Sequence, residues 1–157
     1  MLQKTLVILK PDAVQRRLIG KIISRFEEKG LQIVGMKFIR MTQELARKNY
    51  RQHKGRDFFE PLIRYMTAGP VVAMVLKGKE VVETTRKMAG FTFGTKAEPG
   101  TIRGDYATSS RFNLVHVSDS QEAAEAEIDI FFGADEILEY DAVDNPWIYD
   151  MSQGTII

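Results

Sequence analysis

Two long apolar runs constrain the fold of this chain more than any other feature. Residues Thr5–Leu9 read Thr-Leu-Val-Ile-Leu, and residues Val71–Leu76 read Val-Val-Ala-Met-Val-Leu. Neither run alternates between polar and apolar side chains, so each predicts a strand that is buried on both faces. The sheet that contains these strands must therefore be covered by helices.

Helical periodicity follows the first of these strands. The apolar positions spaced as on one face of an amphipathic helix are Ile19, Ile22, Ile23 and Phe26. Gly30 is typical of the end of such a helix. A second strand is predicted over residues 31–39, and its alternation changes phase at Gly35, which indicates a β-bulge.

Further elements are predicted along the rest of the chain. They are a helix that Thr42 caps and that runs through Tyr50, a short helix over residues 58–65, a helix over residues 79–88, the short strand Leu114–Val117 and a helix over residues 120–132. Ser118 and Gln121 have the spacing of a capping box before the last helix. Residues 89–111 lack a regular pattern, and a loop of this length is usually functional or disordered.

The order of the predicted elements defines the fold class. With the extra helices set aside, the order is βαββαβ, which is the ferredoxin-like arrangement of an α+β protein. We therefore expect a sandwich in which helices cover a four-stranded antiparallel sheet, with a long loop beside it. Residues 1–157 are expected to form a single domain with a C-terminal tail over about residues 133–157, packed onto the body or onto a neighbouring subunit.

Composition excludes several kinds of function. The chain has 22 basic and 21 acidic residues, so its net charge of +1 argues against broad attraction to nucleic acid or to a membrane surface. The absence of cysteine excludes disulfides, thiolate nucleophiles and cysteine-based metal sites, and two histidines do not make a metal cluster. Without a signal peptide or an apolar run of membrane-spanning length, a cytoplasmic protein is expected.

His116 is the most unusual titratable residue. It lies in an apolar run and directly precedes Ser118-Asp119-Ser120, a cluster of helix-capping side chains. A helix N-terminus presents unpaired N–H groups and the positive end of a dipole, so this histidine could face an anion such as a phosphate. Taken alone, the segment fits a buried core histidine better.

Other candidate residues surround the long loop. Lys10 follows the first buried strand, and Arg103 lies between two glycines in the loop, where its guanidinium could approach phosphate oxygens closely. Glu127 falls near the inward face of its helix and could fix one imidazole nitrogen. Seen singly, a solvated lysine at a strand end and a solvated glutamate are the more common structures. Phe58 could stack on a planar base.

Four stretches of the chain together carry a family resemblance. They are Leu9-Lys10-Pro11-Asp12-Ala13-Val14, Gly69-Pro70-Val71-Val72-Ala73-Met74-Val75, Pro99-Gly100-Thr101-Ile102-Arg103-Gly104-Asp105 and Asn113-x-x-His116-x-Ser118-Asp119-Ser120. In this order and at this approximate spacing, they closely resemble the nucleoside diphosphate kinase family from Thr5 to Tyr149.

The resemblance implies a ping-pong transfer of the γ-phosphoryl group from a nucleoside triphosphate to a nucleoside diphosphate, with broad base specificity. The nucleophile would be His116, oriented by Glu127 with help from Ser118. The implied nucleotide-binding residues are Lys10, Tyr50, Phe58, Leu62, Arg86, Thr92, Arg103 and Asn113. Mg²⁺ is expected through the nucleotide phosphates rather than on protein ligands. A homo-oligomer is implied, and the hexamer is favoured over the tetramer.

The chain also departs from the family pattern. Val117 stands where glycine is common, Phe112 where arginine is frequent, and Ser110 where an apolar residue often covers the base. Phe93 and Gly94 replace an Asn-Pro pair in a loop that helps to assemble subunits in the family. These changes leave a second possibility, a nucleotide-binding regulatory relative with impaired phosphotransfer.

An RNA-binding ferredoxin-like module is a third possibility. It would need aromatic side chains on the sheet surface and a basic face. No strand carries such a motif, and the charge is balanced. The sequence therefore favours the kinase.

Overall fold

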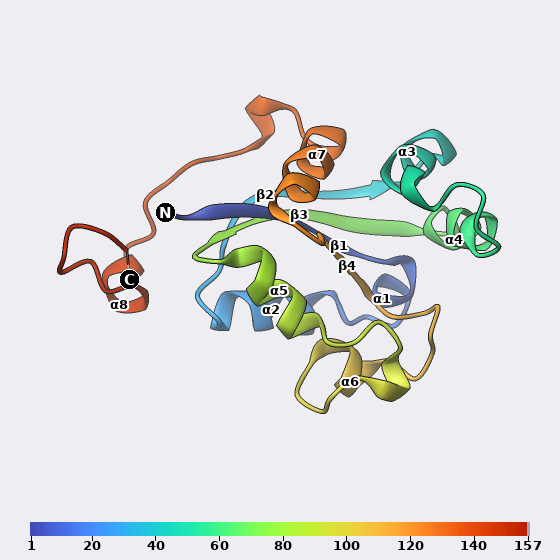
Figure 1. Ribbon diagram of the computed structural model, residues 1–157, viewed down its shortest axis with the longest axis horizontal. Coiled ribbons are helices and arrows are strands. Elements are labelled where there is room, and N and C mark those ends of the chain that lie inside the picture. Colours follow the sequence, from blue (N-terminus) through green and yellow to red (C-terminus); the bar gives the residue numbers. More distant parts are fainter. Residues whose placement is uncertain (157) are drawn as a thin grey trace.

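The computed structural model describes residues 1–156, which contain a four-stranded antiparallel sheet with helices on both faces (Figure 1). The strands are β1 (Gln3–Leu9), β2 (Gln32–Arg40), β3 (Pro70–Gly78) and β4 (Val115–Val117). Their spatial order is β2-β3-β1-β4. All three pairings are antiparallel, so the predicted ferredoxin-like α+β fold is confirmed.

The two apolar runs form the central strands β1 and β3, with Leu6 opposite Val75. Successive side chains of a strand point to opposite faces of the sheet. Leu6 and Ile8 pack in the apolar cluster on one face, and Val7 and Leu9 pack in the cluster on the other. All four are fully buried. The continuous apolar pattern therefore reflects a core on each side of the sheet.

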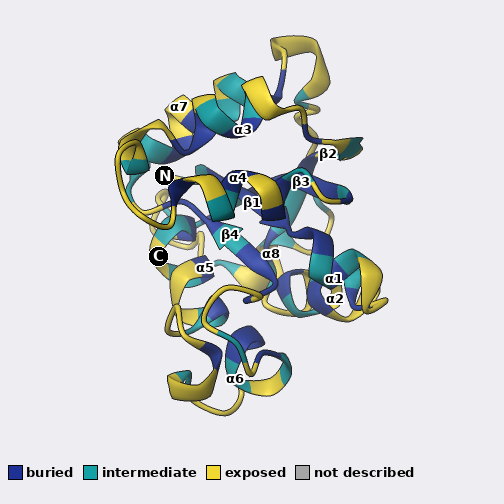
Figure 2. Cartoon of the chain, turned by 90° about the vertical axis from the view of Figure 1, so that its right-hand side faces the viewer, coloured by how far each residue is buried: buried dark blue, intermediate teal, exposed yellow. Residues whose placement is uncertain are grey.

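Two layers of helices cover these clusters. One face carries α3 (Gln43–Asn49), α4 (Phe59–Met66) and α7 (Gln121–Phe131), and the other carries α1 (Pro11–Gln15), α2 (Ile19–Glu28) and α5 (Val81–Ala89), with α6 (Ile102–Tyr106) next to α5. Short 3-10 helices are η1 (Arg51–His53), η2 (Gly94–Lys96) and η3 (Ala134–Glu136). Buried residues gather in the sheet and on the helix sides that face it (Figure 2).

Several local predictions are confirmed. Gly30, after α2, has φ +86°, a left-handed conformation that favours glycine. The pairing of β2 with β3 shifts register between Ile33 and Gly35, which is the predicted bulge. Thr42 caps α3, because its side chain accepts a hydrogen bond from the N–H of Leu45 at 3.1 Å.

Three local predictions need correction. Ser118 does not cap α7. Its hydroxyl donates to Glu127, while Ser120 is the N-cap and accepts from the N–H of Ala123 at 3.1 Å. The unpatterned region 89–111 contains α6, which is too short to show a helical period. Helix α1 was also missed, because the pattern after β1 gives only Pro11 as a start signal.

The beginning of the C-terminal tail packs against strand β2. The N–H of Leu138 donates to the carbonyl of Val34 at 2.7 Å, and Gln32 Nε2 donates to the carbonyl of Tyr140 at 2.8 Å. Farther along lies the short helix α8 (Asn145–Ile148), where Trp147 is 91% exposed. In Figure 1 this helix lies at the opposite end of the molecule from α4 and α6.

Candidate active site

His116 lies in the middle of β4, opposite Ile8 of β1. Its Nε2 is 2.9 Å from Oε2 of Glu127 on α7. An ionised carboxylate only accepts hydrogen bonds, so this contact assigns the ring proton to Nε2 and leaves the lone pair on Nδ1. Within residues 1–156, Nδ1 makes no hydrogen bond. The unprotonated nitrogen of His116 is therefore the one available to a ligand.

Ser118 holds the carboxylate of Glu127 in place next to His116. The hydroxyl of Ser118 donates to the same carboxylate oxygen at 2.7 Å and also lies 3.3 Å from the carbonyl of Leu6. Ser118 is fully buried, and Glu127 is 8% exposed. Since Ser118 directly follows β4, it ties the end of this strand to β1 and fixes the carboxylate that orients the imidazole.

Tyr50, which ends α3, packs its ring against His116. The ring centroids are 5.6 Å apart, and the rings are nearly perpendicular at 87°. Burial raises the pKa of the Tyr50 hydroxyl, and the nearby charge of Glu127 raises it further. The hydroxyl is buried without a hydrogen-bond partner among the described side chains. It therefore remains a protonated donor beside the imidazole.

Lys10 leaves the end of β1 and is only 7% exposed. Its Nζ donates to Oδ1 of Asn113 at 2.7 Å, and Asn113 Nδ2 donates to the carbonyl of Thr92 at 3.0 Å. Burial lowers the pKa of Lys10 to about 7, with a further contribution from the charge of Arg103. This lysine is thus a poorly solvated cation that any bound anion would stabilise.

Arg103, on α6, is fixed by backbone carbonyls. Its guanidinium donates to the carbonyls of Gly90 at 2.9 Å, Val115 at 2.7 Å and Asn113 at 3.2 Å. Burial lowers its pKa to about 10, and the charge of Arg86 contributes as well. The side chain therefore joins the loop, the end of α5 and β4 through one rigid planar group.

The turn that carries Arg103 is closely packed. Thr101 caps α6, accepting from the N–H of Gly104 at 3.0 Å and donating to the carbonyl of Glu98 at 2.7 Å. A Cβ atom at Gly104 would lie 1.9 Å from that carbonyl oxygen. Only glycine allows the backbone to approach this closely. This explains one of the two glycines that flank Arg103 in the sequence.

These residues open onto one pocket of about 690 Å³. Its lining residues are Lys10, Tyr50, Gln52, His53, Phe58, Leu62, Arg86, Gly90, Phe91, Thr92, Phe93, Arg103, Ser110, Arg111, Asn113, Val115, His116, Val117 and Asp119. The structure thus brings His116 together with all eight expected nucleotide-binding residues. Glu127 and Ser118 lie behind the imidazole.

The family departures fall in different places. Ser110, Val117 and Phe93 line the pocket, so each can affect a ligand directly. Phe112 instead packs edge-on against Tyr65, with the ring centroids 5.1 Å apart. Gly94 is buried, and a Cβ atom there would lie 2.4 Å from the carbonyl oxygen of Ala107.

Sequence reasoning missed several pocket residues. They include Gln52, His53, Phe91, Arg111 and Asp119. The ring of His53 packs edge-on against Phe58 with centroids 5.1 Å apart, and burial lowers its pKa. The sequence signal that could have indicated His53 is its position between Tyr50 and Phe58, two expected nucleotide-binding residues. Asp119 was visible only as part of the capping cluster.

The chemistry of the pocket suits an anionic ligand. Four cationic residues, Lys10, Arg86, Arg103 and Arg111, line it together with the oriented imidazole, whereas Asp119 is the one carboxylate in its lining. Guanidinium and ammonium groups bind phosphate oxygens, and a fixed neutral imidazole is a nucleophile near neutral pH. The arrangement is that of a phosphoryl-transfer site.

Comparison with known proteins gives the family. The model of the family described as nucleoside diphosphate kinase matches residues 3–137. A nucleoside diphosphate kinase of Methanobrevibacter smithii is 51% identical over 150 residues, which cover 96% of this chain and 100% of the relative. One from Pyrococcus furiosus is 57% identical over 141 residues, or 88% of each chain.

Solved structures agree with these relatives. A halophilic nucleoside diphosphate kinase from Halobacterium salinarum, solved in complex with CDP, has a TM-score of 0.94 and 43% identity. The match covers 96% of this chain and 100% of that chain. The chain belongs to the nucleoside diphosphate kinase family.

Proposed function

We propose that this chain transfers the γ-phosphoryl group of a nucleoside triphosphate to a nucleoside diphosphate through a phosphohistidine at His116. The observation that carries the proposal is the contact of Glu127 with Nε2 of His116, which leaves Nδ1 unprotonated on a residue that lines the pocket. Family membership supports the same reaction.

The two half-reactions balance around Nδ1. In the first, its lone pair forms a bond to the γ-phosphorus while the bond from that phosphorus to the bridging oxygen breaks, and the nucleoside diphosphate leaves. The ring then carries a positive charge, which the carboxylate of Glu127 stabilises. In the second, a terminal oxygen of another nucleoside diphosphate attacks the phosphorus, and the N–P bond breaks to restore neutral His116.

The surrounding side chains would hold the polyphosphate in line with Nδ1. Phosphoryl transfer is catalysed mainly by positioning and by stabilising charge on the phosphoryl oxygens. Lys10, Arg86 and Arg103 would supply the positive charge. The neutral donors would be Thr92, Tyr50 and Asn113, with Asn113 and Lys10 also within reach of the sugar hydroxyl.

The base would stack on Phe58, with Leu62 beside it. Phe58 is 46% exposed and lines the pocket, so its ring is accessible to a base. Stacking uses the face of a base and tolerates every base, because each has a π-face. Broad nucleotide specificity follows from this type of contact.

The reaction of this family uses a divalent cation. Within residues 1–156, no group of three or more His, Cys, Asp or Glu side chains could hold a metal ion. We propose that this cation is Mg²⁺ and that it is held by the nucleotide phosphates. When bound, it would neutralise charge on the phosphate oxygens.

The proposal is tested by incubation with γ-labelled ATP. The wild-type chain is expected to acquire an acid-labile, base-stable label and to pass it to an added nucleoside diphosphate. His116→Ala should lose the label, whereas His53→Ala, which removes the other histidine, should keep it. A wild-type chain that binds nucleotide but takes up no label would be the regulatory relative instead.

Assembly and location are further proposals. We propose a homo-oligomer, with the hexamer favoured over the tetramer, and the mass of the particle in solution tests this. Within the described part of the chain, no helix is long and apolar enough to cross a bilayer. We propose the cytoplasm as the location, which cell fractionation would check.

A further inference from the structure

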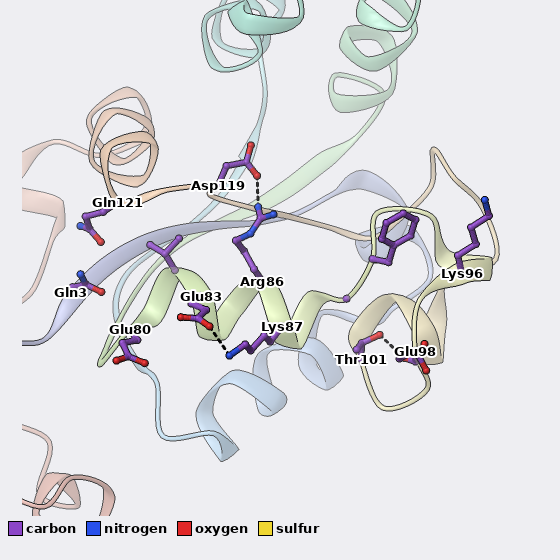
Figure 3. Close-up of a pocket in the computed structure, with 13 residues that line it drawn as sticks. Gln3, Glu80, Glu83, Arg86, Lys87, Lys96, Glu98, Thr101, Asp119 and Gln121 are labelled. Carbon is purple, nitrogen blue, oxygen red and sulfur yellow. Dashed lines mark hydrogen bonds and ion pairs between the residues drawn. The ribbon is translucent and has the colours of Figure 1, made fainter. Parts of the chain in front are cut away.

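Arg86 is paired with a carboxylate at the edge of the nucleotide pocket. Its Nη1 donates to Oδ1 of Asp119, and this ion pair joins α5 to the segment before α7 (Figure 3). Both residues also line a second, more open hollow of about 970 Å³. The ion pair therefore lies on the boundary between the two hollows.

Two further cations of the pocket, Lys10 and Arg103, have different partners. Lys10 donates to the amide oxygen of Asn113, and Arg103 donates to backbone carbonyls. These acceptors are neutral. Among the four cations that line the pocket, which include Arg111, Arg86 alone forms an ion pair within residues 1–156. Arg86 is therefore the pocket cation that is already paired with an anion of the protein itself.

Carboxylate and phosphate oxygens both accept hydrogen bonds from a guanidinium. A given N–H group of Arg86 can therefore donate fully to Asp119 or to a phosphate, but not to both. The side chain of Asp119 is 81% exposed, and that of Arg86 is 48% exposed. A carboxylate displaced from Arg86 would thus move into water rather than into the core. The exchange costs little desolvation.

We propose that Asp119 is a positioning residue that pairs with Arg86 when no nucleotide is bound and competes with the nucleotide phosphates for it. The inference rests on the proposed function. A ping-pong enzyme must release one nucleotide before the next one binds at the same cations. When the carboxylate of Asp119 returns to Arg86, it weakens the binding of the product. It also keeps the guanidinium at the pocket between turnovers.

The test measures the dissociation constant of a nucleoside diphosphate for the unphosphorylated protein by titration calorimetry. Asp119→Asn preserves the shape of the side chain and removes its charge. We expect binding to become about two- to five-fold tighter, the range that an exposed ion pair supports. Arg86→Gln should weaken binding, because it removes the phosphate contact itself.

A double-mutant cycle separates competition from a structural role. In the Arg86→Gln background, Asp119→Asn should have no further effect, since nothing remains to compete for. Tightening that persists in that background would overturn the proposal.

Glu83→Gln is the matched control. It removes one negative charge from the same open hollow, where Glu83 pairs with Lys87 (Figure 3). It should leave the dissociation constant unchanged. Equal tightening by Glu83→Gln would mean that only the overall charge matters, and the proposal would fall. If the wild-type protein binds the diphosphate and Asp119→Asn has the same dissociation constant, this inference fails and the proposed function stands. If the wild-type protein binds no diphosphate, the proposed function is refuted as well.

Discussion

Lys10 and Asn113 lie 103 positions apart in the chain, yet Lys10 Nζ donates to Asn113 Oδ1 at 2.7 Å. The contact joins the end of β1 to the segment that leads into β4. Because the lysine is buried beside Arg103, its charged form is destabilised, and its pKa is lowered to about 7. Two pH-dependent properties follow.

The first is proton uptake on binding. At pH 8 a group with this pKa is only about one-tenth charged. Diphosphate oxygens favour the charged form, so nucleotide binding should take up close to one proton per site at pH 8 and much less at pH 6. Calorimetry in two buffers of different ionisation enthalpy measures this. Lys10→Met should abolish the uptake, and uptake that survives this substitution would assign the proton to another group.

The second is the pH dependence of stability. The pKa of Lys10 in the folded chain is below the ordinary lysine value of 10.5, which applies to the unfolded chain. Burial of Lys10 therefore costs no stability above pH 10.5, where the amine is neutral in both states, and the destabilisation grows as pH falls towards 7. Lys10→Met should therefore raise the free energy of unfolding near pH 7 by a few kcal/mol, at about 1.4 kcal/mol per unit of pKa depression. The gain should shrink towards pH 10. Chemical denaturation at several pH values tests the slope, and a gain independent of pH contradicts it.

Glu127→Gln should slow phosphorylation of His116. The amide can still accept from Nε2, but it carries no charge to stabilise the cationic ring. We expect a loss of about 10- to 100-fold, typical of removing the partner that orients a functional histidine. Rapid-quench measurement of the phosphohistidine gives the rate. Glu125→Gln on the same helix, where Glu125 only accepts from Gln121 at 3.0 Å, is the control and should react normally.

Phe58→Ala should raise the KM for every nucleotide about ten-fold, because stacking on an aromatic ring is worth about 1–3 kcal/mol per base. Inhibition by inorganic tripolyphosphate, which has no base, should not change. Steady-state kinetics with purine and pyrimidine diphosphates check both statements. If tripolyphosphate inhibition weakens equally, Phe58 supports the phosphate site rather than the base.

Gly104→Ala should destabilise the turn that holds Arg103, because the new Cβ atom would lie 1.9 Å from a backbone oxygen. We expect a loss of about 1–3 kcal/mol, which lowers the melting temperature by about 2–4 °C per kcal/mol in a chain of this size. Activity should fall as well. Gly20→Ala is the control, because no atom lies within 4 Å of its Cβ position, and it should stabilise α2 slightly.

The sequence predicts the sheet well because its signal is local. Strands β1 and β3 are read from unbroken apolar runs, and α2 is read from one clear period. The short helix α6 escapes this reasoning, since its five residues do not complete two turns. The sequence predicts Ser118 as a helix cap because its spacing from Gln121 fits one. The partner that it has in the structure, Glu127, lies about two turns along α7 and is not indicated by that spacing.

The site is predictable only in part for the same reason. Residue type and motif point to His116, Lys10 and Arg103. The partner that holds each one comes from a distant segment, such as the Gly90 carbonyl for Arg103 or Asp119 for Arg86. Such contacts depend on side-chain directions, which no pattern along one strand or helix specifies.

The position of α8 has a practical consequence for fluorescence work. Trp147 is the only tryptophan in the chain, and its side chain is almost fully exposed. It lies on α8, at the opposite end of the molecule from α4 and α6, which carry Leu62 and Arg103 of the pocket. Its emission should already resemble that of a free indole in water and should barely respond when a nucleotide docks or when the sheet melts. The emission of Trp147 would shift to shorter wavelength only where another surface covers the tail. The intrinsic fluorescence therefore serves as an optical reporter of subunit association. Ligand titrations need an introduced probe.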